Sequence, residues 1–191
     1  MLKDLIKASR SYRSFDPQAK ITEVQLFDWI DCARFCPSSI NLQMLKFRPV
    51  TSAVECNAVL EKTRWAGKLQ DLTLPPPGHA PVAYIVICAD TQVVKTAEKF
   101  QKDVGICAQT IMLAACEAGF GGCMIGSFSE NEISTVLRLP SHLIPQLVLA
   151  LGKPDEEVAL AELPQNGDTS YYRKSGVHYT PKRDLQDLIV K

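Results

Sequence analysis

Two arginines with a hydroxyl between them stand close to the amino terminus, in the run Arg10-Ser11-Tyr12-Arg13. The two guanidinium groups can converge on one anion if the chain turns directly after a first helix. Guanidinium donors are planar and bind in pairs, which suits a phosphate group or the edge of a polar ring. A solvated basic turn is an equally good interpretation of these four residues taken alone.

Three further segments carry groups that could meet a ligand. Residues 37–43 (PSSINLQ) place short polar side chains after a predicted helix, where they can bond to a ligand or to their own turn. Residues 119–126 (GFGGCMIG) let backbone amides approach a flat ring. Residues 178–183 (HYTPKR) end in two adjacent cations that resemble an anion clamp. Each segment also has an ordinary explanation, respectively a turn, a tight turn into a buried strand and a solvated tail.

The glycine segment does not match a dinucleotide-binding fingerprint. The third glycine of GxGxxG would fall at Met124, and the segment follows a helix rather than a strand. The nearby Cys123 has no neighbour in the sequence that would lower its pKa, so packing is a better explanation of this thiol than nucleophilic catalysis.

Hydrophobic periodicity predicts the elements that position these segments. A first helix with an apolar face at Leu2, Leu5 and Ile6 leads into the two arginines, and a capping box at Thr22 to Gln25 opens a second helix. Residues 82–89 form a continuous apolar run, typical of a strand buried on both faces. Residues 104–118 are apolar nearly all round and end before Gly119, which indicates a helix buried in a core or a subunit interface.

The remaining segments complete one α+β domain over residues 1–191. We expect strands at 47–51, 124–125 and 146–151, helices at 53–69, 130–137 and 182–190, and an acidic loop at 154–168. Strands and helices alternate without a regular βαβ rhythm, which favours a layered α+β fold.

Bulk composition excludes several classes of function. Basic and acidic residues number 21 each, so no broad field would hold nucleic acid or an anionic membrane. No apolar run has membrane-spanning length, and the amino terminus lacks the apolar core of a signal peptide. Seven irregularly spaced cysteines without a CxxC pair indicate reduced thiols in a cytoplasmic protein. The three histidines lack metal-ligand spacing, so we predict no metal site.

The order of the four segments is more informative than any one of them. The chain carries, in this order, R-S-x-R-x-F near the amino terminus, P-S-S-x-N-x-Q after the second helix, a long helix running into G-x-G-G-C-x-I-G, and P-K-R near the carboxyl terminus. Together these motifs resemble those of the nitroreductase family. The likeness extends over essentially the whole chain and is greatest to a compact bacterial-type branch.

This resemblance implies a central mixed or antiparallel sheet flanked by helices, and a homodimer formed through the long central helix with two FMN sites at its interface. It also implies which residues would meet FMN. The phosphate and ribityl chain would be surrounded by Arg10, Ser11 and Tyr12 together with Lys182 and Arg183. Arg13 would reach the pyrimidine edge of the flavin, and Gly121 and Gly122 would lie near N5. The other subunit would contribute Pro37, Ser38, Ser39 and Asn41.

The implied function is transfer of reducing equivalents from NAD(P)H to a small electron-poor acceptor, by a ping-pong mechanism. No catalytic acid or base is expected, because the cofactor carries hydride transfer and the protein supplies binding and electrostatics. Arg13 would stabilise the negative charge that accumulates on the reduced ring. Reductive dehalogenation, flavin breakdown, and a sensor or storage module without useful turnover are the alternatives on the same fold.

Overall fold

The computed structural model is built around a four-stranded sheet in which every pair of neighbouring strands is antiparallel. The structure describes residues 1–69 and 71–190. The strands are β1 (Leu45–Val50), β2 (Ala83–Asp90), β3 (Gly121–Ile125) and β4 (Leu143–Gly152), in the spatial order β1-β2-β4-β3. Strand β2 lies in the interior of the sheet and is buried along its whole length, as its continuous apolar run predicts.

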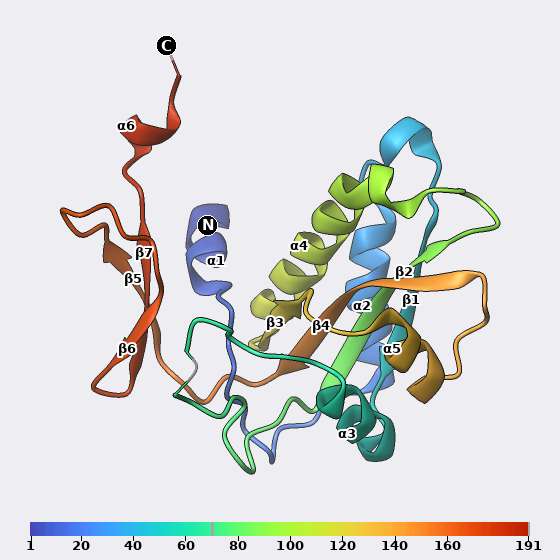
Figure 1. The fold of residues 1–191 in the computed structure, drawn as a ribbon, viewed down its shortest axis with the longest axis horizontal. Helices are drawn as coiled ribbons and strands as arrows, with labels where there is room; N and C mark the ends of the chain where they lie inside the picture. Colours follow the sequence, from blue (N-terminus) through green and yellow to red (C-terminus); the bar gives the residue numbers. More distant parts are fainter. Residues whose placement is uncertain (70, 191) are drawn as a thin grey trace.

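Helices cover both faces of this sheet (Figure 1). Successive side chains of a strand point to opposite faces. Ile85 and Ile87 therefore pack with α2 (Glu23–Arg34) and α4 (Gln101–Glu117), whereas Tyr84 and Val86 pack with α3 (Ala53–Glu61) and α5 (Glu130–Val136). The helices are α1 (Leu2–Ala8), α2 (Glu23–Arg34), α3 (Ala53–Glu61), α4 (Gln101–Glu117), α5 (Glu130–Val136) and α6 (Leu185–Leu188), with short 3-10 turns η1 (Ser39–Asn41) and η2 (Ala97–Phe100).

A second, three-stranded sheet forms from the carboxyl-terminal part of the chain. Its strands are β5 (Val158–Glu162), β6 (Tyr172–Lys174) and β7 (Val177–Lys182). Strand β7 lies in the middle, parallel to β5 and antiparallel to β6. Figure 1 shows this sheet beside α1, with α6 and the carboxyl terminus projecting beyond it.

The α+β architecture and several local features predicted from sequence are confirmed. Thr22 and Gln25 form the reciprocal capping box of α2. Helix α4 ends at Glu117, and Gly119 two residues later has φ +80°, the left-handed conformation that glycine adopts without strain. No helix in the described part of the chain has the length and apolar character needed to cross a membrane.

Three local predictions were wrong. Residues 154–168 are not a loop throughout, because β5 occupies part of them and pairs with β7, which lies well beyond them in sequence. The helix predicted at 53–69 ends at Glu61, and the one predicted at 182–190 is reduced to α6 because Lys182 completes β7. Pairing between distant segments overrides weak local preference in such short stretches.

The first half of β3 lies unusually close to its neighbours. Gly122 is opposite Leu151 of β4, and a Cβ placed on Gly122 would lie 2.0 Å from the carbonyl oxygen of Ala150. A Cβ on Gly121 would lie 2.7 Å from the ring of Tyr12. The two glycines are therefore needed for packing, whatever else lies beside them.

Gly122→Ala should destabilise the protein by at least about 3 kcal/mol, because the added methyl meets backbone that cannot rotate away. Denaturant unfolding monitored by circular dichroism measures the change. The matched control is Gly126→Ala, where nothing lies within 4 Å of the new Cβ. Equal unfolding midpoints for the two variants would contradict the close approach described here.

Candidate functional site

The two-arginine segment runs beside β3, which is an edge strand of the main sheet. Ser11 forms a parallel bridge with Gly122, and the backbone N–H of Tyr12 donates to the Gly122 carbonyl at 2.9 Å. The Tyr12 hydroxyl donates back to the carbonyl of Ala8 at the end of α1, also at 2.9 Å. These bonds fix the turn that sequence analysis required between the first helix and the arginines.

A pocket of about 410 Å³ opens between this segment, α4, β3 and β7. Such a volume suits a small cofactor or ligand. Three cationic side chains, those of Arg10, Arg13 and Lys182, line the pocket together with Ser11 and Gly122, and none of its described lining residues is Asp or Glu. The pocket is therefore suited to an anion.

The guanidinium groups of Arg10 and Arg13 are partly enclosed by the surrounding chain. The Nε atoms of Arg10 and Arg13 are buried and have no partner within the described chain. Arg10 uses one terminal nitrogen to bond the Ile6 carbonyl at 2.8 Å, which orients its guanidinium. Because both Nε atoms are closed off from solvent, an anion in the pocket would reach these guanidinium groups through their terminal nitrogens.

Arg13 is nearly enclosed, with 8% of its surface exposed. Its Nη1 lies 3.2 Å from Nε2 of His178 and donates a hydrogen bond to the Ser11 carbonyl at 3.3 Å. The guanidinium lies over the Tyr171 ring, 5.1 Å from the ring centroid. Glu156 accepts a hydrogen bond from the backbone N–H of Arg13 and forms an ion pair with the side chain of Arg173.

His178 is the functional candidate that sequence analysis missed. It lines the same pocket and is 1% exposed. Burial, together with the positive charges of Arg13 and Arg173, lowers the pKa of its imidazole from 6.5 to about 4. Its only sequence signal was its place in the basic segment 178–183, and neutral histidine beside a cation has no signature in sequence.

A second cavity, of about 370 Å³, adjoins the first. Arg13, Met124 and Tyr171 line both, and Arg64 and Trp65 line the second alone. The loop that contains Arg64 and Trp65 is held at the end of β3. Thr63 forms a bridge with Phe128, and the Arg64 N–H donates to the Ser127 carbonyl at 2.9 Å. The two cavities therefore adjoin at Arg13, Met124 and Tyr171.

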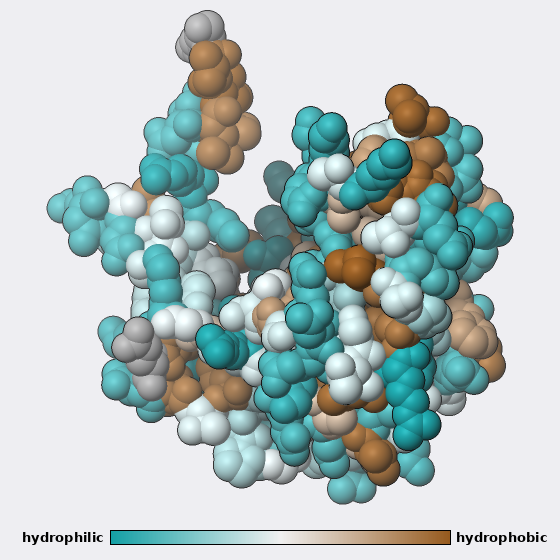
Figure 2. All heavy atoms as spheres, turned by 45° about the vertical axis from the view of Figure 1, so that its right-hand side comes forward, coloured by the Kyte–Doolittle hydropathy of each residue, from teal (hydrophilic) through white to brown (hydrophobic). Residues whose placement is uncertain are grey.

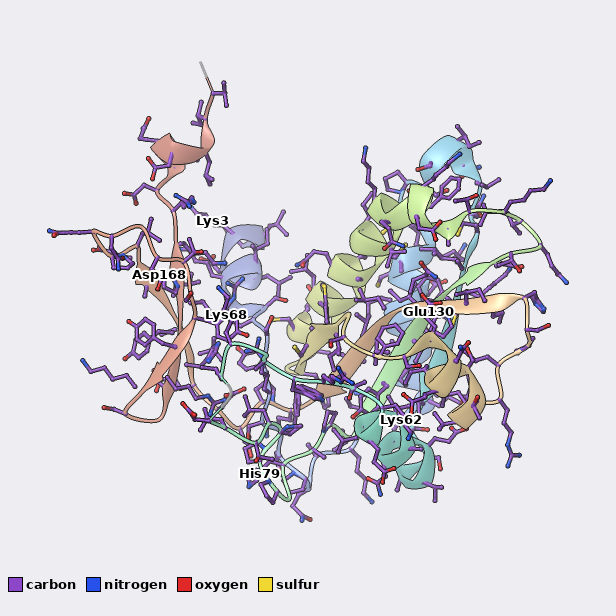
Figure 3. All side chains as sticks on the ribbon, viewed as in Figure 1. Lys3, Lys62, Lys68, His79, Glu130 and Asp168 are labelled. Atoms are coloured by element: carbon purple, nitrogen blue, oxygen red, sulfur yellow. The ribbon has the colours of Figure 1, made fainter. Side chains whose placement is uncertain are left out.

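The loop after Arg64 contacts the residues that precede β6. Lys68 donates from Nζ to the Ser170 hydroxyl at 3.1 Å. Figure 3 shows Lys68 and Asp168 on the same side of the molecule as this sheet. Asp168 accepts from the Ser170 N–H at 2.8 Å, and the hydrogen bonds from Ser170 lower the pKa of the Asp168 carboxyl.

The segment 37–43 lies outside this pocket in the single chain. Ser39 donates from its N–H and its hydroxyl to the buried carboxylate of Asp103 on α4, at 3.0 and 2.7 Å. Pro37 and Asn41 are exposed, and Ser38 lines a different cavity, of about 300 Å³. Ile40, exposed at 89%, has φ +49°, a conformation that a β-branched residue rarely adopts.

The structure thus divides the predicted site residues into groups. One group meets at the pocket: Arg10, Ser11, Arg13, Gly122 and Lys182. Tyr12 and Gly121 pack against each other beside it, and Arg183 is exposed directly after Lys182. The last group lies elsewhere on the same chain: Pro37, Ser38, Ser39 and Asn41. Cys123 is buried, and burial raises the pKa of its thiol, so the structure provides no thiolate here.

Comparison with known proteins agrees with this fold. The model of the nitroreductase family matches residues 6–153, a range that includes the main sheet, its covering helices and the two-arginine segment. The chain belongs to the nitroreductase family.

Relatives match over most of the chain. A protein of Methanothermobacter thermautotrophicus, provisionally named as an NADH dehydrogenase/NAD(P)H nitroreductase, is 27% identical over 84% of this chain and 81% of its own length. A nitroreductase family protein from Clostridium novyi is 26% identical, with a TM-score of 0.66 over 81% of this chain and 86% of that one. A structure titled FMN-dependent nitroreductase, from Clostridium difficile R20291, is 25% identical, with a TM-score of 0.63 over 80% and 87% of the two chains.

Proposed function

We propose that this protein is an FMN-dependent oxidoreductase that passes reducing equivalents from NAD(P)H to a small electron-poor acceptor such as a nitroaromatic or a quinone. The observation that carries the proposal is the convergence of Arg10, Arg13 and Lys182 on one pocket free of acidic lining residues. The relatives' names support it: one of those named above is an NAD(P)H nitroreductase and another is FMN-dependent.

The residues of the pocket fit FMN in charge. Arg10 and Lys182, with Arg183 directly after it in sequence, would hold the phosphate, since a phosphate dianion accepts several charge-assisted hydrogen bonds. Ser11 would add a hydroxyl. Arg13, farther along the same segment and between the two cavities, would meet the polar edge of the ring.

When bound, FMN supplies the hydride transfer. The chain's own residues bind and orient it. The Arg13 guanidinium is a fixed cation in a largely enclosed setting, where a positive charge acts more strongly on a developing negative charge than it would in water. Tyr171 packs over that guanidinium and helps to exclude water from it.

We also propose a homodimer in which Pro37, Ser38, Ser39 and Asn41 complete the site of the partner subunit. Helix α4 buries one face on the sheet but leaves Gly105, Ile106 and Gln109 exposed. Figure 2 shows apolar side chains along the projecting carboxyl-terminal segment, where Leu185, Leu188, Ile189 and Val190 are all exposed. Apolar surface of this extent is typical of an interface.

The dimer predicts a single species of twice the 21.1 kDa chain mass in sedimentation at micromolar concentration. Ser38→Arg should weaken FMN binding in the dimer without unfolding the chain, since the side chain lies at the surface in part. Ser141→Arg, which adds the same charge at an exposed position outside this cavity, serves as the control. A stable monomer that retains FMN would exclude both the dimer and the contacts from the partner.

We place the protein in the cytoplasm. All seven cysteines are free, and Cys56, Cys88, Cys107 and Cys123 are buried, as expected for a reducing compartment. Cell fractionation tests this assignment, and recovery outside the cytoplasm would reject it.

Arg10→Ala should weaken FMN binding tenfold or more, because each lost charge-assisted hydrogen bond costs on the order of 1.5–3 kcal/mol. Quenching of flavin fluorescence on titration of flavin-free protein measures the dissociation constant. The matched control is Lys7→Ala, which removes the same charge from the exposed surface of α1. Wild-type protein that never binds FMN would reject the proposed function, and equal effects of the two variants would reject only the role of Arg10.

Steady-state kinetics should follow a ping-pong pattern, with parallel double-reciprocal lines when NAD(P)H and a quinone are varied. The reason is that the oxidised nicotinamide can leave before the acceptor enters, since the reducing equivalents stay on the bound cofactor. Lines that intersect would indicate a ternary complex and exclude the mechanism. Reduction by neither NADH nor NADPH would favour the alternative of a sensor or storage protein.

A further inference from the structure

The contact between Arg13 and His178 joins two buried side chains from opposite ends of the chain. The guanidinium of Arg13 can only donate hydrogen bonds. Its Nη1 lies 3.2 Å from Nε2 of His178, so Nε2 must be the acceptor. The imidazole is therefore neutral, with its proton on Nδ1, and Nδ1 is buried with no partner within the described chain.

The position of His178 is strongly constrained by its surroundings. It occupies the middle strand of the small sheet, opposite Val158 of β5 and Arg173 of β6. Its backbone N–H donates to the Glu157 carbonyl at 2.9 Å, and its ring lies 5.3 Å from that of Tyr171. A ring fixed in this way fixes the guanidinium that it holds.

The charges around Arg13 are arranged so that no acid neutralises it. The nearest carboxylate partner of this cluster, Glu156, pairs with Arg173 and accepts only the backbone N–H of Arg13. Within the described chain the Arg13 guanidinium forms no ion pair. A carboxylate in the place of His178 would orient the guanidinium equally well but would cancel much of its field.

We infer that His178 is a positioning residue that orients Arg13 toward the pocket and, because it is a neutral acceptor, adds no negative charge beside that guanidinium. This inference rests on the proposed function, in which the anion is the reduced flavin. It gives a reason for a buried histidine between two arginines, since a residue that served only to fill the core would need no acceptor. Preorganisation of a binding group by a second, packed side chain is a general requirement of precise sites.

Three substitutions separate orientation from charge. His178→Gln keeps a neutral acceptor, His178→Leu removes the acceptor, and His178→Glu supplies a charged acceptor. The matched control is His142→Gln, which changes an imidazole outside the pocket. Each holoprotein is titrated for its FMN dissociation constant and for its reduction midpoint, which together give the affinity for reduced relative to oxidised FMN.

We expect His178→Gln to stay within threefold of wild type in this affinity ratio. His178→Leu should weaken binding of reduced FMN at least tenfold more than that of oxidised FMN, equivalent to a midpoint about 30 mV lower for a two-electron couple. His178→Glu should lower the midpoint further, because an ion pair with Arg13 opposes a second negative charge. Equal midpoints in the Gln, Leu and Glu variants would overturn the inference, since a merely structural role would change stability and not the potential.

Nitrogen NMR of flavin-free wild-type protein labelled at histidine tests the contact without any cofactor. The signal missing from His178→Gln identifies this residue among three histidines. It should report a neutral ring protonated at Nδ1 at pH 7. A charged ring, or a proton on Nε2, would overturn the inference even if FMN binds normally. Conversely, wild-type protein that binds no FMN would reject the proposed function, while the NMR result would still decide the state of His178.

Discussion

The free edge of β3 is the constraint on which the rest of the site depends. An edge strand presents unpaired backbone groups that must be covered. Here the two-arginine segment covers them, through the bridge between Ser11 and Gly122 and the bond from Tyr12 to the same glycine. Because Gly121 and Gly122 have no side chains, the segment and β4 can both approach closely. The arginines are thereby placed at the boundary between the main sheet and the small sheet, and the pocket lies at this boundary.

Positive charge is concentrated at this boundary, and a carboxylate neutralises only part of it. Glu156 bonds both the Arg13 backbone and the Arg173 side chain, and so links the two-arginine segment to the small sheet. The guanidinium of Arg13 is left with neutral partners, namely His178, the Ser11 carbonyl and the face of Tyr171. A site that must accept a phosphate and a developing negative charge needs cations of this kind, held in place and not neutralised.

The segment 37–43 is held firmly by its own chain but lies apart from the pocket of that chain. Two bonds from Ser39 to the buried Asp103 tie this segment to α4, and three of its residues have positive φ: Ile40, Asn41 and Gln43. Strained backbone of this kind persists where the surrounding structure fixes it, and it concentrates at functional sites. The segment lies apart from the pocket of its own chain, and in the proposed homodimer it completes the pocket of the partner subunit. The dimer is therefore part of the proposed function and not an addition to it.

The sequence by itself determined what depends on neighbours along the chain. The capping box of α2, the buried run of β2, the glycine that ends α4 and the order of the four motifs were all visible in it, because helix ends, strand burial and turns follow local chemistry. The small sheet was not visible, since β5 is stabilised by β7, about twenty residues further on, and not by its own five residues. His178 was missed for the same reason. Its neutrality and its bond to Arg13 arise from burial and from an arginine 165 positions away in the sequence. Local pattern could identify the cations of the site, but only the tertiary structure could decide which of them lie together and which partner leaves Arg13 its charge.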